Sequence, residues 1–189
     1  MADPREGGFA VAARVGSEYF LRTRRLGFRR WRDEDLELAM ALWGDPQVTR
    51  LIDARGALGR DQVREKLDRE VANDRFYRVQ YWPIFRLEDG EHVGCCGLRP
   101  HTQAQRIFEI GFHIRPGHWR QGYALEAARA VVAHAFYDLG ANALFAGHHP
   151  ENEPSRRLLE KLGFEYQRDE LYPPTGLKHP SYLLRAEEE

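Results

Sequence analysis

The sequence predicts a single α+β domain, with a mostly antiparallel sheet and helices inserted between its strands. Three observations lead to this prediction. The chain has 189 residues, which is enough for one hydrophobic core and short for two. Runs rich in aromatic and β-branched residues are bounded by turn signals, and stretches with apolar residues at helical spacing lie between those runs.

The first third of the sequence predicts one strand and two helices. Residues Tyr19–Trp31 alternate in part between apolar side chains and arginines, which favours a first strand with one solvated face. A first helix is expected from the carboxylates at 33–35, which suit a helix start, to the Gly-Asp-Pro at 44–46. A second amphipathic helix is expected from about Gly59 to Asn73, where apolar residues recur at four-residue spacing.

The middle third predicts a meander of three antiparallel strands. Residues Tyr77–Leu87 and His92–Arg99 are rich in aromatic and β-branched residues, and an Asp-Gly turn joins them as in a hairpin. Pro83 has no N–H to donate, so it indicates a bulge or an edge within the first of these strands. A third run, Arg106–Ile114, follows a polar loop and completes the meander.

The last third alternates helices with short strands. From Gly122 to Leu139 apolar residues recur at helical spacing, and Gly140 is a suitable stop. The next helix opens at Asn152, a favoured N-cap residue, and ends at Gly163. The strands expected around these helices are Ala141–Gly147, Phe164–Gln167 and Ser181–Arg185.

The charge balance and the cysteines limit the classes of function. Lys and Arg number 28 and Asp and Glu 29, so the formal net charge is −1, and no global basic field indicates a nucleic-acid partner. Cys95 and Cys96 are neighbours in a strand-like run, so their side chains point to opposite faces, which suits two buried thiols better than a disulfide. Free thiols are typical of a reducing, cytoplasmic setting.

The sequence indicates one folded domain preceded by an extension. Residues 1–17 are rich in Gly, Ala and Arg without a clear period, and we expect a flexible N-terminal extension there. They lack the apolar core of a signal peptide, and no run of roughly 18 apolar residues is present, so no membrane partner is expected. The folded domain is expected over residues 18–189.

The stretch His113–Ala127 carries the strongest functional signal. A strand-like run breaks at a Pro-Gly pair, turns and enters a helix, and a helix start presents unpaired N–H groups and a positive dipole to an anion. Gly122 has no Cβ, so a phosphate can approach the backbone, and Arg120 adds a positive charge. The alternative is an ordinary strand–turn–helix junction in which Gly122 relieves crowding, and this segment alone does not decide.

Two short motifs lie at strand–helix junctions. The first comprises Trp119, Arg120, Gln121, Gly122, Tyr123 and Ala124. The second, Asn152–Phe164, has the form N-x-x-S followed by LLEKLGF. The first resembles the acyl-CoA pyrophosphate loop of the GCN5-related N-acetyltransferase (GNAT) superfamily, in the form of its RimJ/RimL-like branch, and departs from it at Trp119, where many relatives carry Gln or Arg. The second is similar to a segment of the same superfamily and lies at the expected distance downstream.

The resemblance implies a GNAT-like α+β domain whose mixed, mostly antiparallel sheet is splayed between strands four and five and flanked by helices. It implies transfer of an acetyl group from acetyl-CoA to a primary amine, by direct attack in a ternary complex. The pantetheine arm would pair with the edge of strand four at Phe112, His113 and Ile114, and an N–H near Phe112 would polarise the thioester carbonyl. Gly111 would permit the bulge that this edge requires.

Catalytic candidates follow from the same resemblance. Glu109 is the candidate base, directly or through water, although a carboxylate in a strand can equally lie on an exposed face. Ser155 is the candidate acid, because Leu159 stands where many relatives carry a tyrosine. Asn152 and Ser155 would also contact the pantetheine, and N-capping of a helix by Asn152 is compatible with that role.

Other functions and partners stay open. A non-catalytic acyl-CoA-binding sensor would keep the cofactor pocket without turnover. A metal-dependent hydrolase would use the histidines near residues 113–118 and 148–149, but no metal-ligand spacing supports it, and we expect no metal. The acceptor is a protein N-terminus, as the RimJ/RimL-like branch implies, or a small molecule such as a polyamine or aminoglycoside. Dimers are frequent in this superfamily, so a homodimer is one expectation.

Overall fold

The computed structural model describes residues 18–186, so the extension expected over residues 1–17 lies outside the described residues. Within that range the strands form one eight-stranded sheet with the order β1-β2-β3-β4-β5-β6-β8-β7. Neighbouring strands are antiparallel, except that β5 and β6 are parallel. The strands are β1 Leu21–Arg22, β2 Leu26–Phe28, β3 Tyr81–Arg86, β4 His92–Thr102, β5 Ile107–Ile114, β6 Ala143–Gly147, β7 Glu165–Tyr172 and β8 Leu177–Arg185.

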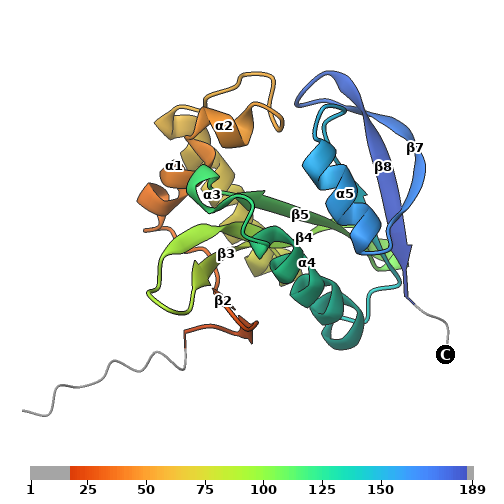
Figure 1. Cartoon of the computed structure of the whole chain (residues 1–189), viewed down its shortest axis with the longest axis horizontal. Coiled ribbons are helices and arrows are strands. Elements are labelled where there is room, and N and C mark those ends of the chain that lie inside the picture. The colour runs from red at the N-terminus through yellow and green to blue at the C-terminus, as the bar shows by residue number, and fades with distance from the viewer. Residues whose placement is uncertain (1–17, 187–189) are drawn as a thin grey trace, which may run out of the picture.

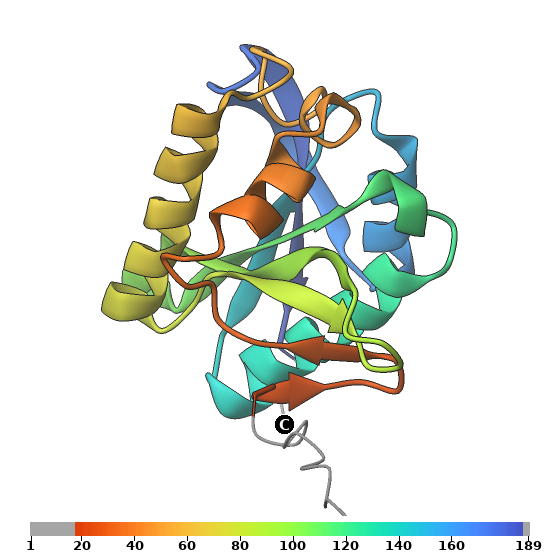
Figure 2. The same ribbon diagram turned by 90° about the vertical axis from the view of Figure 1, so that its left-hand side faces the viewer.

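Helices cover both faces of the sheet (Figure 2). One hydrophobic cluster lies on the face covered by α1 and α3 and includes Tyr81. The other lies on the opposite face of the central strands and includes residues of α4 and α5. Cys95 belongs to the first cluster and Cys96 to the second, so the prediction of two buried thiols on opposite faces is confirmed. The helices are α1 Leu36–Trp43, α2 Pro46–Thr49, α3 Arg60–Tyr77, α4 Tyr123–Ala133 and α5 Glu153–Lys161.

The predicted α+β architecture is confirmed, but the first expected strand is wrong as a single element. Residues Tyr19–Trp31 form a hairpin of β1 and β2 instead. Thr23 makes the turn: its N–H donates to the Leu26 carbonyl at 2.9 Å, and its hydroxyl oxygen accepts from the Leu26 N–H at 3.0 Å. A side chain that satisfies its own backbone in this way favours a turn over a continued strand.

Other boundaries differ from the sequence prediction for local reasons. Helix α3 continues to Tyr77, where an extended run was expected, and ends at Arg78 in a left-handed conformation (φ 60°). Strand β3 lies inside the sheet, so Pro83 does not mark an edge, although a register shift follows one residue later. Helix α4 passes into a π-helical turn over His134–Asp138. Strands β7 and β8 are longer than predicted, and they pair with each other as far as Tyr172 and Leu177. The sequence pattern missed the added part of β7 because its side chains are mostly exposed and show little apolar periodicity.

Strands β5 and β6 diverge, as the family resemblance implied for strands four and five. Their pairing runs from Ile107 opposite Ala143 to Glu109 opposite Phe145 and then ends, whereas β5 continues to Ile114. Strand β4 pairs with β5 along its length. In Figure 1, β7 and β8 accordingly run across the direction of β5. One edge of β5 is therefore left open in the middle of the sheet.

The expected bulge at Gly111 is wrong. Gly111 lies directly opposite Gly97 in a regular part of the β4–β5 register. A Cβ on Gly111 would lie 2.2 Å from the ring of Tyr81, so the glycine provides room for that ring. Its role is close packing beside the open edge of β5.

A buried ion pair fixes Tyr81. The fully buried Glu70 of α3 accepts from the Tyr81 N–H at 2.8 Å and from the Arg99 guanidinium, and that guanidinium stacks 3.8 Å from the centroid of the Tyr81 ring. Removal of one partner from such a pair leaves an uncompensated buried charge. The pair therefore holds α3, β3 and β4 in one arrangement.

We predict that Glu70→Ala lowers the free energy of unfolding by about 3 kcal/mol, because Arg99 and the Tyr81 N–H lose their shared partner. Urea denaturation measures the change. Glu65→Ala removes an exposed carboxylate from the same helix and serves as the control, with an expected effect within about 0.5 kcal/mol. Equal effects of the two substitutions would contradict a structural role for the pair.

Candidate active site

The open edge of β5 presents backbone groups to the gap beside β6. The Arg115 N–H donates to the Val93 carbonyl on the β4 side at 2.9 Å, and the Ile114 carbonyl accepts from the Trp119 indole N–H on the other side at 2.7 Å. Because successive backbone groups of a strand alternate in direction, the N–H and carbonyl of Phe112 also face the gap. This is the position that the resemblance gave to the carbonyl-polarising N–H.

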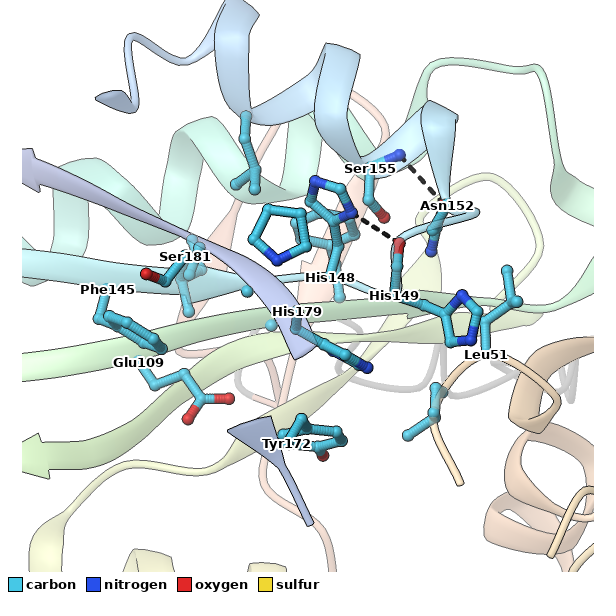
Figure 3. Close-up of a pocket in the computed structure, with 18 of the residues that line it drawn as sticks. Leu51, Glu109, Phe145, His148, His149, Asn152, Ser155, Tyr172, His179 and Ser181 are labelled. Carbon is cyan, nitrogen blue, oxygen red and sulfur yellow. Dashed lines mark hydrogen bonds between the residues drawn. The ribbon is translucent and has the colours of Figure 1, made fainter. Parts of the chain in front are cut away.

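Two cavities meet at this edge. The first, of about 440 Å³, lies between the end of β5 and the starts of α4 and α5, and we call it the turn cavity. The second, of about 280 Å³, lies between β5, β6 and β8, and we call it the histidine cavity (Figure 3). The residues that line both cavities are Leu51, Ile52, Phe112, His113, Asn152 and Ser155.

The start of α4 has the geometry of an anion site. Gly122 is the N-cap residue with φ 79°, Arg120 is also left-handed with φ 60°, and within residues 18–186 no side chain caps this helix start. The N–H groups of Gly122, Tyr123 and Ala124 precede the first intrahelical hydrogen bond, so they remain available to a ligand. All these residues line the turn cavity, whereas Gln121 does not, and its side-chain amide donates to the Gly117 carbonyl at 3.2 Å.

Arg25 adds positive charge at the same turn. Its guanidinium donates to the Gln121 carbonyl at 2.9 Å and to Glu126 at 2.6 Å, and it lies 4.4 Å from the centroid of the Tyr123 ring. A neighbouring hollow is lined by Arg24, Arg25 and Arg129. The sequence interpretation placed the N-terminal arginines on an exposed face and missed this contact, because only the β1–β2 hairpin brings them to α4.

Trp119 stabilises the open edge. Trp119 is 42% exposed, and its indole N–H donates to the carbonyl of Ile114, the last residue of β5. The indole N–H at this motif position therefore binds the backbone of β5. Trp119 fixes the end of the strand and forms part of the wall of the turn cavity.

Glu109 lies at the point where β5 and β6 separate, and it lines the histidine cavity. The Tyr81 hydroxyl donates to its Oε1 at 2.9 Å. Burial and the charge of Glu109 raise the pKa of Tyr81 well above its usual value, so the phenol stays protonated and remains the donor. The carboxylate is half-buried and oriented, and the exposed-face alternative for Glu109 is wrong.

The expected pairing of the pantetheine with the backbone of His113 is wrong, because by the same alternation its N–H and carbonyl point toward β4, and only Phe112 and Ile114 present theirs to the gap. The Nδ1 of the His113 ring accepts from the Trp43 indole N–H at 3.1 Å. Burial, with the charges of Lys66 and Arg99, holds the pKa of His113 well below its usual value. A proton-carrying role for this ring is therefore disfavoured.

Asn152 and Ser155 stand at the start of α5, where both cavities meet (Figure 3). The Asn152 Oδ1 accepts from the Ser155 N–H at 3.2 Å, so the predicted N-cap is confirmed. The cap leaves the Asn152 side-chain amide and the Ser155 hydroxyl at the cavity wall. Leu159, the residue that replaces the family's tyrosine, is buried.

Three buried histidines line the histidine cavity and bond to protein groups. The His148 Nδ1–H donates to the His149 carbonyl at 2.8 Å, and His148 Nε2 accepts from the Tyr182 hydroxyl at 3.2 Å. His149 Nδ1 accepts from the Glu151 N–H at 3.1 Å. Burial lowers the pKa of His179 to about 4, so this ring is neutral near pH 7. Among residues 18–186, no three His, Cys, Asp or Glu side chains are grouped as a metal site requires.

Sequence interpretation missed Tyr81, Tyr172 and His179 as cavity residues. Tyr81 lies in a run that predicted only a buried strand. Tyr172 and His179 lie beside the Pro-Pro-Thr-Gly turn, where no motif marks them. They reach the cavity because β7 and β8 fold back beside β6.

A backbone anion turn beside an open strand edge is the arrangement of an acyl-coenzyme-A-dependent transferase. Comparison with known proteins gives the family. Residues 25–165 match the model of the acetyltransferase (GNAT) domain. YoaA of Bacillus subtilis, described as an uncharacterized N-acetyltransferase, is 34% identical over 145 residues, which are 77% of this chain and 82% of YoaA. The chain therefore belongs to the GNAT family.

Solved structures of the RimJ/RimL type share the fold. Mycobacterium smegmatis RimJ, in complex with CoA-disulfide, has a TM-score of 0.71 at 21% identity, over 85% of this chain and 82% of RimJ. RimL, a ribosomal L7/L12 alpha-N-protein acetyltransferase in complex with coenzyme A, has a TM-score of 0.76 at 12% identity, over 89% of this chain and 98% of RimL. The family match confirms the GNAT resemblance stated from the two motifs, and these two structures show that the fold is shared with RimJ and RimL.

Members of this family transfer acetyl groups from acetyl-CoA, so the chain is an acetyl-CoA-dependent acetyltransferase. The turn cavity fits this cofactor, because it combines uncapped N–H groups, a glycine without Cβ and nearby arginines. None of the helices within residues 18–186 has the length and apolar composition to cross a membrane.

We predict that Gly122→Glu lowers coenzyme A affinity by at least about 100-fold, because it places a carboxylate where the turn would receive phosphate. Gly122→Ala is the matched control, since it adds the same backbone strain at φ 79° without charge and should bind more tightly than the Glu variant. Titration calorimetry measures both affinities, and thermal melts confirm folding. Wild-type affinity for coenzyme A in a folded Gly122→Glu protein would show that the turn is not part of the cofactor site.

Proposed function

We propose that the chain is an N-acetyltransferase that moves the acetyl group of acetyl-CoA to a primary amine, a protein N-terminus or a small molecule, by direct attack in a ternary complex. The observation that carries the proposal is the meeting of two cavities at the open edge of β5. The turn cavity suits the donor, and the histidine cavity, which contains Glu109, suits the acceptor. Both substrates can then be present together at Phe112.

Each requirement of the reaction has a candidate group. Acetyl-CoA supplies an activated acetyl thioester when bound. The Phe112 N–H faces the gap and would polarise the acetyl carbonyl oxygen. Glu109, held by the Tyr81 hydroxyl, would accept the proton of the attacking amine directly or through one water. Ser155 would hold a proton for the leaving sulfur.

Asn152 and Ser155 act together in this proposal. The cap at the start of α5 fixes Asn152, whose amide would bind the pantetheine beside β5, and it places the Ser155 hydroxyl in the cavity wall. Two residues of one helical turn thus replace the tyrosine that many relatives use. A protein in which Leu159 simply removed the acid would be an acyl-CoA sensor without turnover, which is the second candidate function.

Thiol release from acetyl-CoA separates the two functions. A panel of peptides, amino acids, polyamines and aminoglycosides is assayed spectrophotometrically, with coenzyme A binding measured in parallel. Amine-dependent thiol release supports the transferase. Tight coenzyme A binding without thiol release for any amine would support the sensor instead.

We predict that Glu109→Gln lowers kcat by about 100- to 1,000-fold with coenzyme A affinity unchanged, because the base is lost and the turn cavity is intact. Tyr81→Phe removes the hydroxyl that holds Glu109 and should lower kcat by about 10-fold. The two effects should not add, since Tyr81 acts through Glu109. Steady-state kinetics of both single variants and the double variant measure this coupling.

Additive losses in the double variant would show that Tyr81 acts independently of Glu109. A folded Glu109→Gln enzyme with wild-type kcat would show that another group is the base. Glu165→Gln, which changes an exposed carboxylate on β7, is the control and should leave the kinetics unchanged.

A further inference from the structure

The histidine cavity contains a lysine that has no anionic partner among residues 18–186. Lys66 of α3 lines this cavity but not the turn cavity, and its ammonium lies 5.3 Å from the centroid of the Trp43 ring. Within residues 18–186 this ammonium has no hydrogen bond and no ion pair. A half-buried cation is normally stabilised by an opposite charge, so this one indicates a missing anion.

The neighbouring carboxylate, Glu70, does not pair with Lys66. Glu70 directs one oxygen to Arg99 and the other to the Tyr81 N–H at 2.8 Å. Arg99, which also lines the cavity, is thereby paired, and Lys66 is the unbalanced charge. Burial first, and then the positive charge of Arg99, lower the pKa of Lys66 to about 8. The ammonium is still mostly protonated near pH 7, in surroundings short of negative charge.

The other carboxylates that line the cavity are engaged elsewhere. Glu109 accepts from Tyr81 at 2.9 Å, and Glu170 accepts from Arg168 at 2.7 Å. The α3 side of the cavity thus presents positive charge, and the point where β5 and β6 separate presents the candidate base. A ligand with an amine and an acidic group matches this distribution.

We propose that the acetyl acceptor carries a carboxylate in addition to its primary amine, with the amine at Glu109 and the carboxylate at Lys66. The inference rests on the proposed N-acetyltransferase function and narrows it to amino-acid-type acceptors. A polyamine or aminoglycoside matches this charge distribution poorly, because its further ammonium groups would face Lys66 and Arg99. The carboxylate belongs to a free amino acid or to an acidic residue near a peptide N-terminus.

Matched pairs of acceptors test the inference. Thiol release is measured with each of the protein amino acids and with its C-terminal amide, which has the same side chain but no α-carboxylate. Dipeptides beginning with Asp or Glu and their Asn or Gln counterparts distinguish a side-chain carboxylate, and spermidine represents the polycations. For at least one pair, the acid should exceed the neutral partner in kcat/KM by about 10- to 100-fold, as a charged hydrogen bond predicts.

Variants at residue 66 test whether Lys66 causes the preference for acidic acceptors. Lys66→Gln should reduce the ratio of kcat/KM for the acid to that for its neutral partner to less than about 3-fold, and Lys66→Arg should retain most of this ratio. If the Gln variant melts early, Lys66→Met replaces it, because its unbranched apolar chain still packs against Trp43. Lys161→Gln, on the exposed end of α5, is the control and should leave the ratio unchanged. Coenzyme A affinity by calorimetry should be the same in all of them, because Lys66 is outside the turn cavity.

The outcomes distinguish a failure of the acceptor inference from a failure of the transferase proposal. If amines release thiol but neutral acceptors or spermidine match or exceed the acids, the carboxylate inference is overturned and the transferase stands. If acids are preferred and folded Lys66→Gln keeps the ratio, the assignment to Lys66 is overturned. If no amine releases thiol, the transferase proposal fails and the acceptor inference fails with it.

Discussion

The divergence of β5 from β6 is the constraint on which the site depends. A strand within a sheet normally has both edges paired, and unpaired backbone N–H and C=O groups are available to bind another extended chain. Here the pairing ends at Glu109 and Phe145, and β5 continues for five residues with only β4 beside it. The backbone of Phe112 therefore faces a gap in the middle of the molecule, and this gap joins the two cavities.

Several interactions keep that gap from closing. The helices α4 and α5 pack on one face of the central strands and place their N-termini on the side where β5 ends. The Trp119 indole N–H binds the last carbonyl of β5, and the Asn152 cap fixes the start of α5. The turn at Gly122 remains uncapped by side chains of the described residues, and Arg25 holds its backbone in place.

Tyr81 links stability to the chemistry. Its N–H donates to Glu70, its carbonyl accepts from the Trp31 indole at 2.6 Å, and its hydroxyl donates to Glu109. Gly111 provides the space for its ring. The buried pair formed by Glu70 and Arg99 thus helps to hold the candidate base, and within residues 18–186 Lys66 forms no ion pair. A buried polar network is stable only when all its members have partners, and an anionic ligand would supply the partner for Lys66.

Periodicity and glycine chemistry predicted most elements, because the buried faces of α1, α3, α4 and the central strands repeat at regular spacing. The Gly122 turn, the Asn152 cap and the faces of Cys95 and Cys96 also followed from local rules. Arg25, Tyr172 and His179 could not be predicted, since each reaches its site through a long-range contact of a hairpin. Gly111 was misread as a bulge because a sequence does not show which ring lies across a strand. Lys66 looked like one charge among many on an amphipathic helix.

Amide hydrogen exchange with and without coenzyme A reports on the backbone groups that the open edge of β5 presents. We expect coenzyme A to slow exchange at Phe112 on β5 and at Gly122–Ala124 at the start of α4, with little change along β7. Protection confined to other segments, or unchanged exchange at Phe112 under saturating coenzyme A, would contradict cofactor binding at this edge.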